Sequence, residues 1–130
     1  MWVLDTNTLI YFFKGEGRVA GELLNRSPKD IGIPSVVLYE LKVGIAKSSA
    51  PDKRSRQLAE LTSVVQVLPF HEREAHASAE LRAALEREGR PIGPYDTLIA
   101  GTAMAHGAVL VSRNTREFDR VAGLRVEDWY

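Results

Sequence analysis

The sequence contains no cysteine, which excludes disulfide bonds, thiolate catalysis and metal sites with cysteine ligands. It also has no apolar run long enough to cross a bilayer. Because the chain begins directly with an apolar, strand-like segment, we expect it to carry no signal peptide. These absences predict a cytoplasmic protein that has no membrane partner.

An excess of charge of either sign is missing as well. The 17 basic and 17 acidic residues balance to a formal net charge of +0, so no overall positive field can attract a nucleic acid. Any such contact must come from a local basic patch. The composition, 45% hydrophobic and 26% charged, is typical of a folded chain, and 130 residues suffice for a core. We therefore expect residues 1–130 to form a single domain.

Apolar segments that alternate with amphipathic ones predict an α/β fold. Strands are expected over residues 2–4, 30–34, 64–68, 108–111 and 124–126. Helices are expected over residues 8–14, 18–26, 36–47, 52–62, 71–88 and 95–106. Thr6 or Asn7 is expected to cap the first helix, and Ser35 the third. Strands joined through helices run parallel, so the sequence predicts a mainly parallel central sheet of about five strands flanked by helices.

Three acidic residues interrupt these apolar patterns. Asp5 directly follows the first strand, Glu40 lies on the helix over 36–47 with mostly apolar helical neighbours, and Asp96 opens the helix over 95–106. Each has a plain structural explanation when taken alone. Asp5 and Asp96 can stabilise helix N-termini, and Glu40 can bend from an apolar stripe into water.

Together the three acids suggest a different role. In a parallel sheet their positions can converge at the carboxyl ends of the strands, where ligands bind in open α/β folds. Three neighbouring carboxylates repel one another and raise each other's pKa values, and a divalent cation relieves that repulsion. A cluster of oxygen ligands suits Mg²⁺ or Mn²⁺ better than zinc or copper. Such a site can position a phosphate and lower the pKa of a bound water for in-line attack.

Several short motifs occur in a fixed order along the chain. They are Val3-Leu4-Asp5-Thr6-Asn7; Tyr39-Glu40-Leu41 with Gly44; Gly93-Pro94-Tyr95-Asp96 with Ile99-Ala100; Val111-Ser112-Arg113-Asn114 with Glu117-Phe118; and the ending Asp128-Trp129. With these motifs the chain resembles the PIN-domain ribonucleases, and more narrowly the VapC-type toxins of bacterial toxin–antitoxin pairs. The resemblance covers essentially the whole length and implies a PIN-like fold.

The resemblance implies a Mg²⁺-dependent endoribonuclease whose metal ligands are Asp5, Glu40 and Asp96. It also implies a homodimer inhibited by a VapB-type antitoxin. The branch with this ending is similar to toxins that cut initiator tRNA in the anticodon stem-loop. Many members carry a fourth acid where this chain has Asn114. We expect Asn114 to line the site, while Asp119, with Glu117 close by, is the alternative for the fourth position.

Other side chains are expected to assist this site. Thr6 and Asn7 are expected to hold Asp5 by hydrogen bonds while also capping the first helix. Arg113 and Arg116, together with Arg120, follow the fourth strand and could hold RNA phosphates, although a solvated basic face explains them equally well.

The helices over 36–47 and 52–62 should form a hairpin, broken at residues 48–51, that cannot bury all of its apolar positions. The groove left there would suit an amphipathic helix of a partner protein. An Arg or Lys on that partner would be attracted by the acidic site beside the groove.

Two other functions fit part of the sequence. Asp5-Thr6-Asn7-Thr8 after a strand resembles the haloacid-dehalogenase phosphatases, in which the first Asp is the nucleophile. Those enzymes have a second Asp two residues later and a paired acidic motif late in the chain, whereas this chain has Asn7 and lacks the late motif. The other alternative is a PIN domain that has lost its activity and serves only as a binding module. The presence of all three acids argues against this alternative.

Overall fold

The computed structural model describes all 130 residues and contains five strands, seven α-helices and one short 3₁₀-helix. The strands are β1 (Trp2–Leu4), β2 (Ile31–Pro34), β3 (Gln66–Leu68), β4 (Val109–Val111) and β5 (Arg125–Glu127). The helices are α1 (Thr6–Lys14), α2 (Val19–Leu24), η1 (Pro28–Asp30), α3 (Ser35–Ala46), α4 (Pro51–Thr62), α5 (Glu72–Arg87), α6 (Pro94–Ala105) and α7 (Thr115–Phe118).

The five strands form one sheet in the order β3-β2-β1-β4-β5, and every neighbouring pair is parallel. Successive strands first build outward on one side of β1, and the chain then crosses to the other side to add β4 and β5. The strand order therefore reverses between β1 and β4, which is where open parallel sheets usually bind their ligands. The expected α/β, mainly parallel, five-stranded sheet is confirmed.

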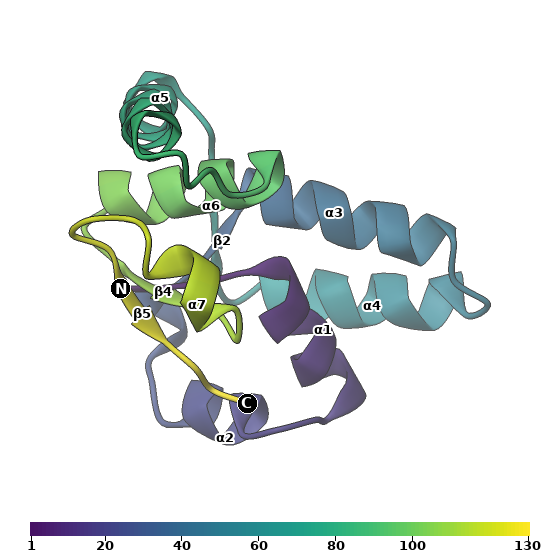
Figure 1. Ribbon diagram of the computed structural model, residues 1–130. Helices are drawn as coiled ribbons and strands as arrows, with labels where there is room; N and C mark the ends of the chain where they lie inside the picture. The colour runs from purple at the N-terminus through teal and green to yellow at the C-terminus, as the bar shows by residue number, and fades with distance from the viewer.

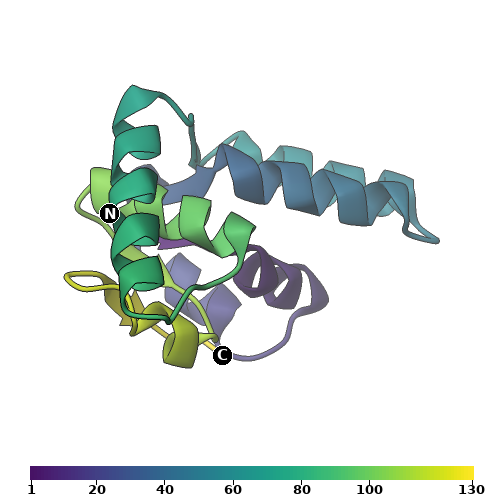
Figure 2. The same ribbon diagram turned by 45° about the horizontal axis from the view of Figure 1, so that its top comes forward.

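Helices cover the sheet on both faces (Figure 1). Helices α5 and α6 lie on one side, and α1 and α2 on the other. Helices α3 and α4 pair as a hairpin that extends sideways, away from the sheet, as Figure 2 shows from a second direction. No helix is long and apolar enough to cross a membrane.

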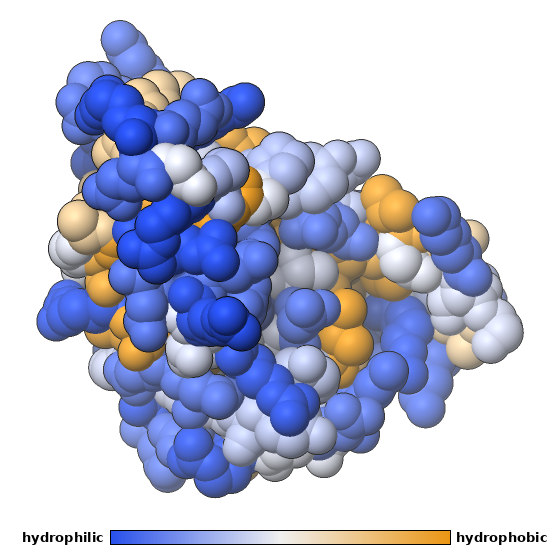
Figure 3. All heavy atoms as spheres, in the orientation of Figure 1, coloured by the Kyte–Doolittle hydropathy of each residue, from blue (hydrophilic) through white to orange (hydrophobic).

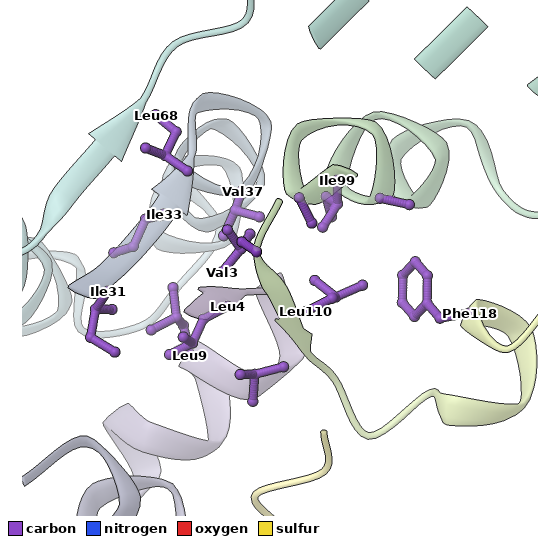
Figure 4. Close-up of a cluster of buried hydrophobic side chains, with 14 of the residues drawn as sticks. Val3, Leu4, Leu9, Ile31, Ile33, Val37, Leu68, Ile99, Leu110 and Phe118 are labelled. Carbon is purple, nitrogen blue, oxygen red and sulfur yellow. The ribbon is translucent and has the colours of Figure 1, made fainter. Parts of the chain in front are cut away.

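The core lies between the sheet and these helices, as Figure 4 shows. Val3 and Leu4 of β1, Ile33 of β2 and Leu110 of β4 have no exposed surface, because the central strands are covered on both faces. Their apolar side chains therefore fix the position of the strand ends from which the acidic residues follow.

The two ends of the chain meet around a single cation. The guanidinium of Arg26 lies 4.5 Å from the ring centroids of both Trp2 and Trp129. Both indole N–H groups donate to the carboxylate of Glu127, at 3.1 Å from Trp2 and 3.2 Å from Trp129. Cation–π contacts and these hydrogen bonds hold the C-terminal residues against β1.

Several expected details of the elements differ from the structure. Asp5, not Thr6 or Asn7, caps α1, because its carboxylate accepts the Thr8 backbone N–H at 2.9 Å and the helix begins at Thr6. Ser35 is already within α3, and its hydroxyl donates to the Leu68 carbonyl of β3 at 2.8 Å. Helix α7, which starts one residue after Asn114, was not expected because four residues show too little periodicity.

Helices α5 and α6 pack closely because Gly101 on α6 leaves room for Ser78 of α5. A Cβ atom added at Gly101 would lie 2.7 Å from the Ser78 Cβ and 2.8 Å from its Cα, and the latter is backbone that cannot swing aside. Gly44 on α3 is the contrasting case, since a Cβ there would meet nothing within 4 Å.

Replacement of Gly101 by alanine should therefore destabilise the protein by about 1–3 kcal/mol through overpacking. Gly44→Ala should instead stabilise it by up to about 1 kcal/mol, because alanine favours the helical state. Urea unfolding followed by circular dichroism measures both changes. An unchanged unfolding midpoint for Gly101→Ala would contradict the close approach of α5 and α6.

Candidate active site

The carboxylate of Asp5 lies at the carboxyl end of β1, the middle strand of the sheet. The backbone N–H of Asp5 donates to the Val111 carbonyl of β4 at 3.1 Å, and the Thr8 hydroxyl donates to the same carbonyl at 3.2 Å. Only 5% of Asp5 is exposed. Burial raises the pKa of Asp5, while hydrogen bonds from Ser112 and Thr8 oppose that shift.

Glu40 reaches the same region from α3. Its carboxylate accepts a hydrogen bond from the Thr6 hydroxyl at 2.7 Å, and Thr6 is the residue that follows Asp5. Thr6 therefore orients Glu40 and not Asp5, contrary to expectation. Asn7 is exposed and makes no side-chain hydrogen bond, so the expected support of Asp5 by Asn7 is also absent. Thr8 and Ser112 hold Asp5 instead.

Asp96 opens α6 behind Gly93 and Pro94 and is half-buried. Burial is the main cause that raises the pKa of Asp96 from 3.8 to about 6, followed by the negative charges of Asp5, Glu117 and Glu40. An acid with that many acidic neighbours prefers to keep its proton. Asp96 therefore shares one electrostatic environment with the carboxylates of Asp5, Glu40 and Glu117, and the charge of Asp128 also raises the pKa of Asp5.

The residues after β4 are arranged differently from the expectation. Glu117 of α7 acts on Asp96, whereas Asp119 is exposed at the C-terminal end of α7 and does not. Asn114 precedes α7, and its side-chain amide donates to the Glu117 carboxylate at 2.9 Å. Asn114 therefore holds Glu117, and Glu117 is the fourth acid at this edge of the sheet.

None of the four carboxylates has a basic partner. The ion pairs of the structure involve neither Asp5, Glu40, Asp96 nor Glu117. No three acidic or histidine side chains are already close enough to hold one metal ion together. The donor set nevertheless fits a hard divalent cation, because the candidate ligands are all oxygen atoms and none of them is neutralised by an ion pair.

A cleft of about 290 Å³ adjoins Glu40 between α1 and the α3–α4 hairpin. Ile10 and Phe13 of α1, Ile45 of α3 and Arg54 of α4 are among its lining residues. Figure 3 shows hydrophobic side chains exposed where the hairpin meets the rest of the molecule. A second hollow of about 550 Å³ lies between α3 and α4 and is lined by Leu38 and Leu58, among others. The expected apolar groove is therefore present, with Glu40 at its border.

The arginines after β4 do not form one cluster. Arg113 stacks on the ring of Tyr130, with the guanidinium 3.7 Å from its centroid. Arg116 and Arg120 instead line a polar pocket of about 270 Å³ together with Arg90 from the loop between α5 and α6. Sequence order could not reveal Arg90, because the pocket depends on where that loop lies against α7.

Three comparisons with known proteins agree with one another. A model of the PIN domain matches residues 2–124. The tRNA(fMet)-specific endonuclease VapC of Shigella flexneri is 40% identical over 128 residues, which are 98% of this chain and 97% of that protein. The protein of the same name from Salmonella typhimurium is 39% identical over equal shares.

Solved structures give the same result. The DNA-bound VapBC of Salmonella typhimurium contains a chain that matches with a TM-score of 0.92 and 37% identity, covering 99% of this chain and 98% of that one. VapBC2 of Rickettsia felis, bound to a promoter DNA fragment, matches with a TM-score of 0.89 and 33% identity over the same shares. These likenesses support the PIN alternative over a haloacid-dehalogenase phosphatase.

The electrostatics of Asp96 generate a prediction about stability. Because its pKa is about 6 in the folded protein and 3.8 ordinarily, ionised Asp96 opposes folding above pH 6, and protonation at lower pH removes that cost. In chelator, Asp96→Asn should therefore melt several degrees higher than wild type at pH 8. The difference should shrink as the pH falls through 6 and vanish near pH 4.

Differential scanning fluorimetry from pH 4 to pH 8 measures this difference. Asp119→Asn is the matched control, because Asp119 is exposed at the end of α7 and should show no such trend. A melting difference for Asp96→Asn that stays constant with pH would contradict the raised pKa of Asp96 and its repulsion by Asp5, Glu40 and Glu117.

Proposed function

This chain belongs to the PIN-domain family and, within it, to the VapC ribonucleases of toxin–antitoxin systems, and we propose that it hydrolyses RNA at the carboxylate cluster with Mg²⁺ bound to Asp5, Glu40 and Asp96. Mn²⁺ should substitute. The convergence of four unpaired carboxylates from four elements is the observation that carries this proposal.

Each residue of the cluster has a separate task. Asp5 is held rigidly by the Thr8 backbone N–H at 2.9 Å, and the Thr6 hydroxyl keeps Glu40 turned toward the site at 2.7 Å. Glu117, held by Asn114, supplies the fourth acid beside Asp96. A divalent cation bound there would hold a phosphate oxygen and lower the pKa of a water for in-line attack on phosphorus.

The proposed substrate is initiator tRNA, cut in the anticodon stem-loop. The support is the likeness to relatives named as tRNA(fMet)-specific endonucleases, which are 40% and 39% identical over 98% of this chain. A loop also suits the site physically, because proteins read unpaired RNA bases more readily than the deep groove of an RNA duplex.

Loss of a ligand charge should abolish cleavage without loss of the fold. We expect Asp5→Asn and Asp96→Asn to reduce the rate at least about 100-fold, and Glu117→Gln to reduce it more than Asp119→Asn. Chelator should silence the wild type, and Mg²⁺ or Mn²⁺ should restore it. Single-turnover cleavage of labelled initiator tRNA measures these rates, and circular dichroism checks that each variant folds.

Mapping of the new RNA ends tests the chemistry of the cut. Attack by water leaves a 5′-phosphate and a 3′-hydroxyl, since the ribose 2′-hydroxyl takes no part. Full activity in chelator, or a 2′,3′-cyclic phosphate product, would contradict a metal-dependent hydrolysis. Complete inactivity toward total RNA, with Mg²⁺ present, would favour the inactive binding module.

Arginine side chains offer the RNA backbone a local positive patch, which the net charge of +0 makes necessary. Arg116 belongs to α7, the same short helix that carries Glu117. Arg90 and Arg120 line the same pocket, and Arg120 is fixed by a hydrogen bond to the Pro91 carbonyl at 3.1 Å. Arg113, stacked on Tyr130, is a further phosphate contact in this proposal.

Charge reversal at Arg116 should weaken RNA binding equally for all sequences and reduce the slope of log affinity against log salt by about one. Filter binding at several salt concentrations, with Asp5→Asn as background to prevent cleavage, measures both quantities. Arg82→Glu is the control, because Arg82 pairs with Glu86 on the exposed side of α5. An unchanged salt slope for Arg116→Glu would contradict a phosphate contact.

The proposed protein partners are a VapB-type antitoxin and a second copy of this chain. The cleft beside Glu40 can take an amphipathic helix of the antitoxin, with an Arg or Lys directed at the carboxylates. The support is the likeness to chains from the VapBC structures of Salmonella typhimurium and Rickettsia felis.

Expression of this chain alone should stop bacterial growth, and co-expression with the small DNA-binding protein encoded beside it should restore growth. Gly44→Leu should keep the toxicity but escape the neutralisation, because its side chain would fill the cleft, while Gly44→Ala should behave as wild type. Growth curves and co-purification measure both effects. A non-toxic, strictly monomeric wild-type protein that binds no such neighbour would contradict the proposal.

A further inference from the structure

Two exposed tyrosines lie together at the edge of the carboxylate cluster. Tyr39 of α3 is 52% exposed and Tyr95 of α6 is 45% exposed, although aromatic rings are usually buried. Their ring centroids are 5.8 Å apart, with an angle of 65° between the ring planes. In this arrangement the edge of one ring meets the face of the other, and about half of each tyrosine stays open to solvent.

The position of this pair relates it to the proposed chemistry. Tyr39 directly precedes Glu40, and Tyr95 directly precedes Asp96. Adjacent Cα atoms are about 3.8 Å apart, so the backbone of each tyrosine adjoins that of a residue that we assign to the metal site. The two tyrosines come from different helices, and their contact joins α3 and α6 beside the cluster.

We propose that Tyr39 and Tyr95 form a stacking platform for an unpaired RNA base next to the cleaved phosphodiester. The inference rests on the proposed ribonuclease function and deepens it, because it names how the substrate strand is held. Single-stranded RNA is bound largely by stacking of its bases on exposed aromatic side chains. The geometry offers that surface within one residue of two proposed metal ligands.

The chemistry of the surroundings favours a base over other occupants. An acidic partner segment would be repelled by Glu40 and Asp96, and a basic one would be drawn to those carboxylates instead of the rings. A nucleobase is planar and neutral, so it can lie on a tyrosine beside acidic groups without an electrostatic cost. Its attached phosphate then extends toward the carboxylate cluster, where the proposed cation would neutralise it.

The test compares an intact anticodon stem-loop RNA of initiator tRNA with a series in which one loop nucleotide at a time is abasic. Binding is measured by fluorescence anisotropy in Mg²⁺, with Asp5→Asn as a common background. One abasic position should bind about 5- to 150-fold more weakly, as loss of one stacked base predicts. In the Tyr39→Ala/Tyr95→Ala double variant that penalty should disappear.

The Tyr39→Phe/Tyr95→Phe variant is the matched control, because it keeps both rings and should keep the abasic penalty. Cleavage of the same RNAs without the Asp5→Asn change should show the loss in KM and not in kcat. An abasic penalty of equal size in the wild-type and alanine backgrounds would overturn the inference. A change from dimer to monomer in the alanine variant alone, measured by light scattering, would also overturn it, since the rings would then contact a second copy.

These results separate the inference from the proposed function. If the protein cleaves RNA but no abasic position shows a binding penalty that depends on the tyrosines, the ribonuclease proposal is retained and the platform is rejected. Base-dependent binding that requires the two rings, without any cleavage, rejects the nuclease proposal and keeps only the stacking of an RNA base on the two rings. A wild-type protein that neither binds nor cuts these RNAs rejects both.

Discussion

The buried carboxylate of Asp5 is the group about which the rest of the structure is arranged. An aspartate that is only 5% exposed is unfavourable unless its carboxylate is hydrogen-bonded, and here the Thr8 backbone N–H of α1 and the Ser112 hydroxyl provide those bonds. Because β1 is the middle strand, Asp5 lies at the point where the order of strands reverses. Helices that follow β1, β2 and β4, and the helix that precedes β4, all bring polar groups toward that point.

Glu40 borders two proposed binding surfaces, the carboxylate cluster and the cleft for the antitoxin. Glu40 belongs to the carboxylate cluster through its charge on Asp96, and it also borders the cleft between α1 and the α3–α4 hairpin. A helix that fills the cleft must therefore approach a proposed metal ligand. In our proposal, antitoxin binding and RNA cleavage exclude each other because they compete for the surroundings of Glu40, and no long-range change of shape is required.

Much of this organisation was predictable from the sequence, since it follows from periodicity and from acids that interrupt it. The five strands, the parallel sheet and the nearness of Asp5, Glu40 and Asp96 depend on patterns that extend over whole elements. The unpredicted features depend on single contacts between distant segments. The bond from Thr6 to Glu40, the choice of Glu117 over Asp119, and the pocket shared by Arg90 and Arg116 all require coordinates, because no local pattern specifies which side chains meet.

The contact of Arg26 with Trp2 and Trp129 has a practical consequence for optical work on this protein. The chain has only these 2 tryptophans, and both rings lie 4.5 Å from the same guanidinium. Intrinsic tryptophan emission therefore reports on one cluster, where the two ends of the chain meet, and does not report on the carboxylate site. Its intensity reports whether the C-terminal residues are attached to β1, so emission and circular dichroism will diverge wherever that end detaches before the helices unfold.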